Sequence, residues 1–172
     1  MASTNLIIDQ VSTVDTVQRF PLGTLYEEPA GFGTDRDPAV SGSKSDRGRR
    51  IWIYVFNDSG SSIVRGTVCC RKALTTTYNV RAVPTTTVPS AGIVGIGDHT
   101  IATANYGWLI REGMAEVIAD TGGLTAENGL VPGGAVAGTA DTSATLTDGG
   151  FGVTTETVLA TALATCLVNC RG

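Results

Sequence analysis

The sequence predicts a mainly β fold, a small antiparallel β-barrel or β-sandwich, preceded by an extended N-terminal arm. Three observations support this class. Every residue in 51–56 is β-branched or aromatic, which is typical of a strand. Beyond that segment, turn signals rich in Gly, Pro, Asn and Asp recur about every ten residues, a spacing typical of sandwiches and barrels. Tyr106 and Trp108 share one face of a further strand, because alternate strand residues point the same way.

Length and composition indicate one domain with a substantial core. The chain has 172 residues, of which 42% are hydrophobic and only 16% charged, which argues against disorder. A surface with so little charge favours association with other subunits. Residues 1–82 carry ten Lys and Arg against eight Asp and Glu, whereas residues 83–172 carry two against eight. This balance excludes a general nucleic-acid binder, which needs a basic stripe.

The N-terminal 50 residues differ from the rest of the chain. Pro21, Pro29 and Pro38 interrupt a run rich in Gly and charge, and Pro disfavours helix interiors. We therefore expect an extended arm and linker over residues 1–50, with at most short strand or helix pieces, and a β-rich domain over 51–172. No signal peptide and no apolar run of about 20 residues is found, so we expect synthesis in the cytoplasm and no membrane partner.

The expected elements follow in chain order. A strand at 51–56 ends at a turn over 57–60, and a second strand at 62–71, bent at Gly66, makes a hairpin with it. Residues 74–83 and 91–97 continue the β pattern. Residues 105–118 are expected to form two short strands broken at Gly113, closed by a turn at 120–123. Residues 124–131 are a strand candidate, and 141–150 is expected to be a loop.

The tail over residues 154–170 fits two structures. As a helix, apolar residues at every fourth position would form one stripe. As a strand, Ala164, Cys166 and Val168 would share a face of small residues while Thr alternates with Leu on the other. The Thr content and the surrounding β pattern favour the strand.

No segment predicts catalysis, a metal site or a cofactor. His99 is the only histidine and has neither a nucleophile motif nor metal-ligand spacing around it. The glycines of 92–97 do not fit the dinucleotide fingerprint. Glu27 and Glu28 are expected to be solvated. The four cysteines lack C-x-x-C spacing and are expected to be small, buried thiols; they are Cys69, Cys70, Cys166 and Cys170.

Two surface hypotheses remain. Four aromatic residues, Trp52, Tyr54, Tyr106 and Trp108, could form a stacking platform for sugars or single-stranded nucleic acid. Packing in the core or between subunits is favoured instead, because aromatic rings supply large buried areas. The basic cluster of Lys44, Arg47, Arg49 and Arg50 is either a solvated loop, which is favoured, or a contact with an acidic protein surface.

Several phrases resemble one family. The segment Asn57-Asp58-Ser59, followed by residues 63–68, is similar to the opening of capsid decoration, or cement, proteins of tailed bacteriophages. Tyr106-Gly107-Trp108 and the residues through Val117 resemble a strand pair of those proteins, and the Gly-rich turns and the ending over 152–168 fit the same pattern. The resemblance covers about residues 51–170 and includes no catalytic motif.

The resemblance implies a non-enzymatic virion protein that binds the outer surface of the phage head as a homotrimer and stabilises the shell. Its partner would be the major capsid protein, with no nucleic acid, membrane or cofactor involved. The candidate subunit or capsid contacts are Leu6, Ile7, Ile8, Arg47, Arg49, Arg50, Trp52, Tyr106 and Trp108. An alternative is a tail- or head-fibre-associated β module that recognises host-surface carbohydrate, with aromatic residues exposed in a groove. A small hydrolase is a third possibility, which the sequence does not support.

Overall fold

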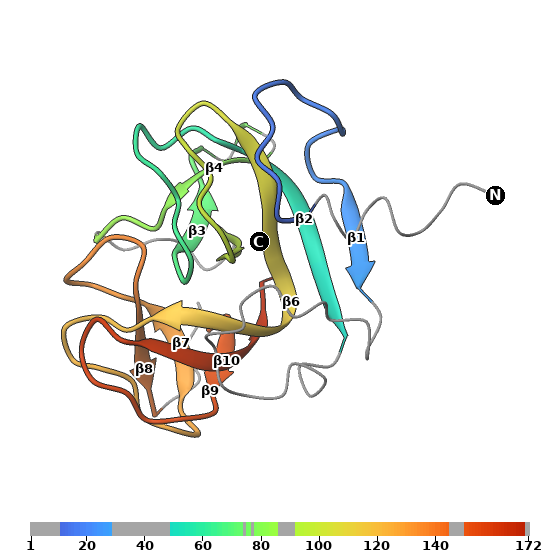
Figure 1. Ribbon diagram of the computed structural model, residues 1–172. Coiled ribbons are helices and arrows are strands. Elements are labelled where there is room, and N and C mark those ends of the chain that lie inside the picture. The colour runs from blue at the N-terminus through green and yellow to red at the C-terminus, as the bar shows by residue number, and fades with distance from the viewer. Residues whose placement is uncertain are drawn as a thin grey trace.

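The computed structural model describes residues 11–28, 49–73, 75–76, 78–85, 92–144 and 150–170. Within these residues, ten strands form one continuous hydrogen-bonded arrangement, which confirms the mainly β, barrel-like prediction (Figure 1). No helix in this part of the chain is long and apolar enough to cross a membrane. The strands are β1 (Leu25–Glu28), β2 (Arg50–Asn57), β3 (Val68–Arg71), β4 (Asn79–Ala82), β5 (Ile93–Gly97), β6 (Tyr106–Ile118), β7 (Gly129–Pro132), β8 (Ala140–Ser143), β9 (Gly152–Thr154) and β10 (Leu163–Asn169).

Five strands close into a first barrel. β2 pairs antiparallel with β6, β6 with β5, β5 with β3, and β3 with β4. A parallel pairing of β4 with the end of β2 closes the ring. Residues at alternate strand positions fill its interior, as the two-residue period of strands requires. The interior residues are Ile53, Val55, Ile63, Cys69, Val80, Val94, Ile101 and Leu109.

β6 belongs to two barrels. Its first half pairs with β2 and β5, and its second half pairs with β10. The expected pair of short strands is therefore one strand of 13 residues. Gly113 lies where the two halves meet, with φ at 108°, and a Cβ there would lie 2.5 Å from the carbonyl oxygen of Arg49. Glycine thus lets one strand pass from the first barrel to the second without interruption.

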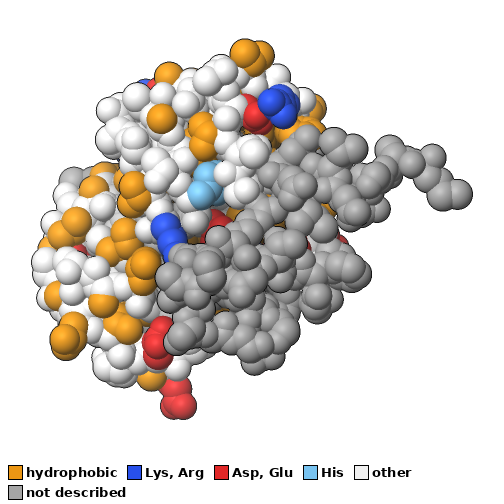
Figure 2. Space-filling view, viewed as in Figure 1, with side chains coloured by type: hydrophobic (Ala, Val, Ile, Leu, Met, Phe, Trp, Pro, Cys, Tyr) orange, Lys and Arg blue, Asp and Glu red, His pale blue; other side chains and the backbone are white. Residues whose placement is uncertain are grey.

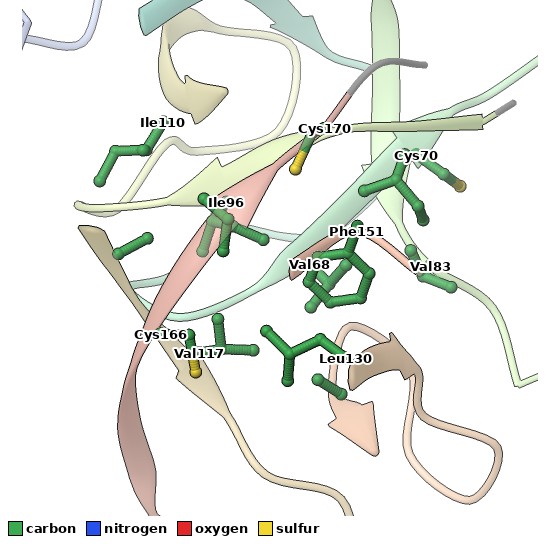
Figure 3. Packing of buried hydrophobic residues seen from close by; sticks show 14 of the residues in the cluster. Val68, Cys70, Val83, Ile96, Ile110, Val117, Leu130, Phe151, Cys166 and Cys170 are labelled. Atoms are coloured by element: carbon green, nitrogen blue, oxygen red, sulfur yellow. The ribbon is translucent and has the colours of Figure 1, made fainter. Parts of the chain in front are cut away.

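The second barrel repeats the pairing order of the first. β6 pairs with β10, β10 with β9, β9 with β7, and β7 with β8, all antiparallel. A parallel bridge between Ala119 and Ala140 closes this ring. Figure 3 shows Leu130, Phe151 and Cys166 of this barrel close to Val68 and Ile96, which point outward from the first barrel. One apolar cluster therefore fills the second barrel and joins it to the first.

Several sequence-based assignments change in the structure. The expected hairpin of 51–56 with 62–71 is wrong, because β3 pairs with β4 and β5 while Ile63 bridges Ile101. The strand expected at 124–131 is confined to β7, with Leu124 in a separate bridge to Val158. Part of the loop expected at 141–150 belongs to β8.

The strand prediction for the tail is confirmed over β10. Ala164, Cys166 and Val168 are buried, whereas Leu163 and Leu167 on the opposite face are exposed. The residues just before β10 form a bridge and a turn. Gly66 lies in the predicted bend, with φ at 84°.

Candidate interaction surfaces

The aromatic face of the first barrel is covered by the chain's own N-terminal segment, residues 11–28. Trp52, Tyr54 and Trp108 point away from the barrel interior and are at most 2% exposed. Phe20 lies edge-on to Tyr54 at 5.2 Å and tilted against Trp108 at 5.4 Å, measured between ring centroids. Tyr26 meets Trp108 at 6.4 Å. The rings pack against one another rather than forming an open stacking platform.

Main-chain hydrogen bonds fix this segment in place. Asp15 and Tyr106 exchange two, with N···O distances of 3.0 and 2.8 Å. The N–H of Gly23 donates to the carbonyl of Tyr54 at 2.8 Å, and the N–H of Tyr54 donates to Thr24 at 2.9 Å. β1 then pairs antiparallel with the first half of β2. In Figure 1, β1 lies beside β2 at the edge of the first barrel.

A buried polar contact accompanies these bonds. The Tyr54 hydroxyl donates to Asp15 Oδ2 at 3.0 Å, and Arg19 forms an ion pair with the same carboxylate at 2.9 Å. Burial, together with the neighbouring Asp15 carboxylate, raises the pKa of Tyr54 to about 12. The hydroxyl therefore stays protonated and keeps its role as a donor to Asp15.

A second buried polar cluster lies at the end of β1. The Glu28 carboxylate accepts hydrogen bonds from Arg50 Nε and from the Trp52 indole N–H, both at 2.9 Å. Arg50 Nη2 lies 2.8 Å from the same carboxylate, and the guanidinium lies 5.0 Å from the centre of the Trp52 ring. The neighbouring pair of Arg49 and Glu27, at 2.8 Å, is exposed. Successive residues of β1 point to opposite sides, so one glutamate is solvated and the next is buried.

The structure shows where the candidate subunit or capsid contacts named in the sequence analysis lie. Arg50, Trp52 and Trp108 are buried against this chain's own residues, while Tyr106 is half-buried and bridges Asp15. Arg49 is exposed and paired with Glu27. Leu6, Ile7, Ile8 and Arg47 lie outside the described residues.

The second barrel carries an exposed apolar face that was not among the candidate contacts. Val153 on β9, with Leu163 and Leu167 on β10, are 40%, 41% and 53% exposed. Leu167 lies between Val153 and Met114, and Leu163 lies opposite Ile118, so these five side chains cross three strands. We call this set the apolar face. In Figure 2, hydrophobic side chains are frequent at the lower left of the molecule, where Figure 1 places the strands of the second barrel.

The apolar face carries one neutralised charge pair. Arg65 pairs with Glu116, which lies opposite Thr165 between the two leucines of β10. The alternation of Thr with Leu in the sequence indicated this outward face, but nothing in that pattern showed that it is left uncovered. A face of this kind is suited to contact with an uncharged protein surface.

A cleft at the end of the first barrel holds a polar turn. Its volume is about 330 Å³, and Phe56, Asp58, Lys72 and Arg81 are among the lining residues. The hydrogen bond from Lys72, at 2.7 Å, holds the pKa of Asp58 below its usual range. Asn57 donates to the carbonyl oxygens of Ser61 and Ile101, both at 2.8 Å. These side chains fix the turn after β2, so the Asn57-Asp58-Ser59 phrase has a structural explanation.

The four cysteines are buried. All four are free thiols with no access to solvent, and burial raises the pKa of Cys166 and of Cys170 to about 12. Such thiols stay protonated and are weak nucleophiles. Within the described residues, no group of three or more His, Cys, Asp and Glu side chains could hold a metal ion.

Comparison with known proteins shows a likeness of fold. No protein-family model matches the chain, and the search of curated proteins found no match. The structure is similar to the head fibre gp8.5 N base of bacteriophage phi29, with a TM-score of 0.50 and 12% sequence identity. The match covers 69% of this chain and 94% of the phi29 chain. At this identity the likeness is one of fold.

Proposed function

We propose that the protein is a non-enzymatic structural component of a bacteriophage particle. It binds the outer surface of the head as a homotrimer and stabilises the shell by bridging neighbouring copies of the major capsid protein. The observation that carries the proposal is the likeness of its fold to the base of a phage head fibre. The exposed apolar face and the low charge content support a role in assembly.

The stabilising mechanism is linkage between binding and assembly. A protein that binds several shell subunits at once, and only in their assembled arrangement, shifts the equilibrium toward that arrangement by mass action. A trimer would make three such contacts with a raised effective concentration after the first one. A single contact needs about 1,200–2,000 Å² of total buried surface to be stable alone. Each contact can be smaller when three of them are linked in one trimer.

A second candidate is the base that attaches a fibre to the head. The similarity to a structure described as a head fibre base favours it specifically. The carbohydrate-binding form of that alternative has less support, because Trp52, Tyr54 and Trp108 are covered by residues 11–28 and offer no sugar-stacking surface. The two candidates differ in effect: a cement protein raises the stability of the shell, whereas a fibre base leaves it unchanged.

The test uses phage heads that lack the protein. Purified protein is added, bound copies are located by cryo-EM, and the temperature at which heads release DNA is measured with and without it. Binding as trimers at threefold positions with a higher release temperature is the expected result. Binding without any change in release temperature would favour the fibre base, and absence from every site on the head would overturn the proposal.

The same experiment has an informative deletion. Removing residues 1–50 would also remove β1 and uncover the aromatic face, so loss of binding could reflect unfolding. Removing residues 1–10 leaves every described contact in place. The shorter deletion therefore tests whether residues 1–10 contribute to binding while the rest of the protein stays folded.

A further inference from the structure

The two barrels share the same register of strand pairing. In the first, Ile53 pairs with Leu109 and Val55 with Gly107; in the second, Ala115 pairs with Cys166 and Val117 with Ala164. β3 and β4 pair Cys69 with Ala82 and Arg71 with Val80, and β7 and β8 pair Leu130 with Thr142 and Pro132 with Ala140. The bridge between Ile63 and Ile101 recurs as the bridge between Leu124 and Val158.

Hydrogen bonds outside the strands repeat as well. Ala104 donates its N–H to the carbonyl of Asn57 at 2.9 Å, and Thr161 donates to Ala119 at 3.1 Å. Ala104 and Thr161 are non-glycine residues with positive φ, at 59° and 61°. A left-handed conformation at equivalent positions is unusual enough to identify one turn used twice. The chain thus contains two copies of one five-stranded unit, and β6 belongs to both.

This equivalence relates the apolar face to the aromatic face. With Ile53 matched to Ala115, Trp52 corresponds to Met114 and Phe56 to Ile118. With Leu109 matched to Cys166, Tyr106 corresponds to Leu163 and Ile110 to Leu167. In the first barrel, residues 11–28 cover the part of this face around Tyr106 and Trp108, whereas Ile110 and Ile96, the equivalents of Leu167 and Val153, lie on the side of the second barrel. In the second barrel, the corresponding face is exposed. The first barrel therefore shows what kind of structure covers such a face.

The cover on the first barrel is an extended segment of chain. It forms a main-chain bridge to Tyr106, places Phe20 and Tyr26 on the rings, and packs Leu22 against the same apolar cluster. Leu163 occupies the position of Tyr106 in the second barrel, on the outward side of β10. The apolar face is thus shaped for an extended peptide that bonds to the main chain at Leu163 and lays aliphatic side chains across β6 and β10.

We propose that the apolar face binds residues 1–10 of a second copy of this chain. These residues directly precede Val11. Val11 is buried in the core of its own chain and therefore fixes the point from which residues 1–10 leave it. Ten extended residues reach at most about 33–36 Å, enough to cross a neighbouring barrel. From here on, the arm means residues 1–10. Leu6, Ile7 and Ile8 give it an aliphatic centre, and Asp9 is its only charged side chain.

The chemistry of the two surfaces agrees. In the first barrel, the aromatic ring of Phe20 packs on the ring of Trp108. In the proposed contact, the aliphatic residues of the arm would pack on the aliphatic Leu163 and Leu167. The pairing of Arg65 with Glu116 neutralises the charge of the glutamate between the two leucines, which suits an arm with so few charges. Arm to face is a heterologous contact, which closes into a ring when the rotation between copies allows it. The inference concerns contact between copies and is independent of attachment to a phage head.

The first test measures self-association of the full chain by analytical ultracentrifugation. We expect an oligomer that becomes monomeric when residues 1–10 are deleted or when Leu163→Ser and Leu167→Ser are combined, with Kd raised at least about tenfold. Leu159→Ser is the matched control, because Leu159 is 84% exposed and lies outside the apolar face. A monomeric wild-type chain, or an oligomer that survives the deletion, would overturn the inference.

The second test mixes the two defective variants. The deletion variant keeps its face and the double serine variant keeps its arm, so together they can form one arm-to-face contact that neither forms alone. A photo-crosslinking residue in place of Leu167 should then join to residues 1–10, and isotope labelling of one variant shows whether the link is between copies. Crosslinks within a single chain, or to other parts of the second copy, would refute the proposed occupant.

Discussion

Glu28 offers a direct test of how the N-terminal segment is held. Its carboxylate accepts hydrogen bonds from Arg50 and from the Trp52 indole, and its side chain is 5% exposed while that of Arg50 is 10% exposed. Glu28→Ala removes the carboxylate and leaves the guanidinium buried without its opposite charge. It also leaves the indole N–H without its acceptor.

The expected loss of unfolding free energy depends on how deeply each ion pair is buried. Removing one partner of a buried ion pair costs about 3–5 kcal/mol, because an uncompensated charge remains in a low-dielectric site. Glu27→Ala removes the same kind of group one residue away, but Glu27 and its partner Arg49 are 58% and 55% exposed. An exposed pair contributes about 0.2–1 kcal/mol. The two variants should therefore differ several-fold in their loss of unfolding free energy.

Urea unfolding followed by tryptophan fluorescence measures both losses, since the chain's two tryptophans are buried beside β1. A double variant, Glu28→Met with Arg50→Met, should recover most of the loss, because it removes the unpaired charge. The indole N–H would still lack an acceptor, at a cost of about 1–3 kcal/mol. Equal losses for Glu27→Ala and Glu28→Ala, or no recovery in the double variant, would refute the reasoning.

Three further predictions concern the barrels. Gly113→Ala should lower the free energy of unfolding by about 1–3 kcal/mol from backbone strain alone, whereas Gly134→Ala, where a Cβ meets nothing within 4 Å, should be nearly neutral in the same urea assay. The raised pKa of Cys166 and Cys170, about 12 against an ordinary 9.0, means that their contribution to stability is complete below pH 9 and declines as pH rises toward 12. Thermal unfolding at pH 7, 9 and 10.5 checks this, and a stability that increases over that range would contradict it. Asp120→Ala removes the acceptor of three backbone N–H groups, at 2.8–3.0 Å, and should cost about 1–3 kcal/mol and speed proteolysis of the loop between β7 and β8.

Local patterns predicted the strands that are most strongly marked. Residues 51–56 were identified as a strand by β-branched and aromatic content, and the tail by its alternation of small and large residues. Both signals depend only on neighbouring residues. Strand formation at such sites follows from local preference combined with burial on one face or both.

Pairing could not be predicted in the same way. β2 and β6 are joined by a segment that contains three other strands, and no local signal states which strands become neighbours. The expected hairpin followed the rule that consecutive strands pair, whereas here β3 turns away to β4 and β5. The duplication was equally hidden, because equivalent interior positions such as Ile53 and Ala115, or Cys69 and Leu130, share burial but not identity.

The contacts of the candidate surface residues also depend on strand pairing, which local patterns do not predict. Arg50 and Trp52 were selected for their chemistry, but the side chain that engages both is Glu28, more than 20 residues away. Glu27 and Glu28 were expected to be solvated alike, and a strand of four residues is too short to reveal which one faces inward. Only the pairing of β1 with β2 decides it.

The difference between the two barrels explains why one face is covered within the chain and the other is not. An exposed surface of tryptophan and tyrosine rings would be a large aggregation hazard, so the aromatic face requires a cover that is always present. The face that contains Leu163 and Leu167 also includes Thr165 and the paired Glu116, so it can meet water in the free chain. Binding to that face is then reversible and depends on concentration, as contact between copies requires. The interiors of the two barrels must satisfy the same packing, whereas their outer faces are free to differ. In the first barrel the outer face is covered by the chain itself, and in the second it is left exposed for binding.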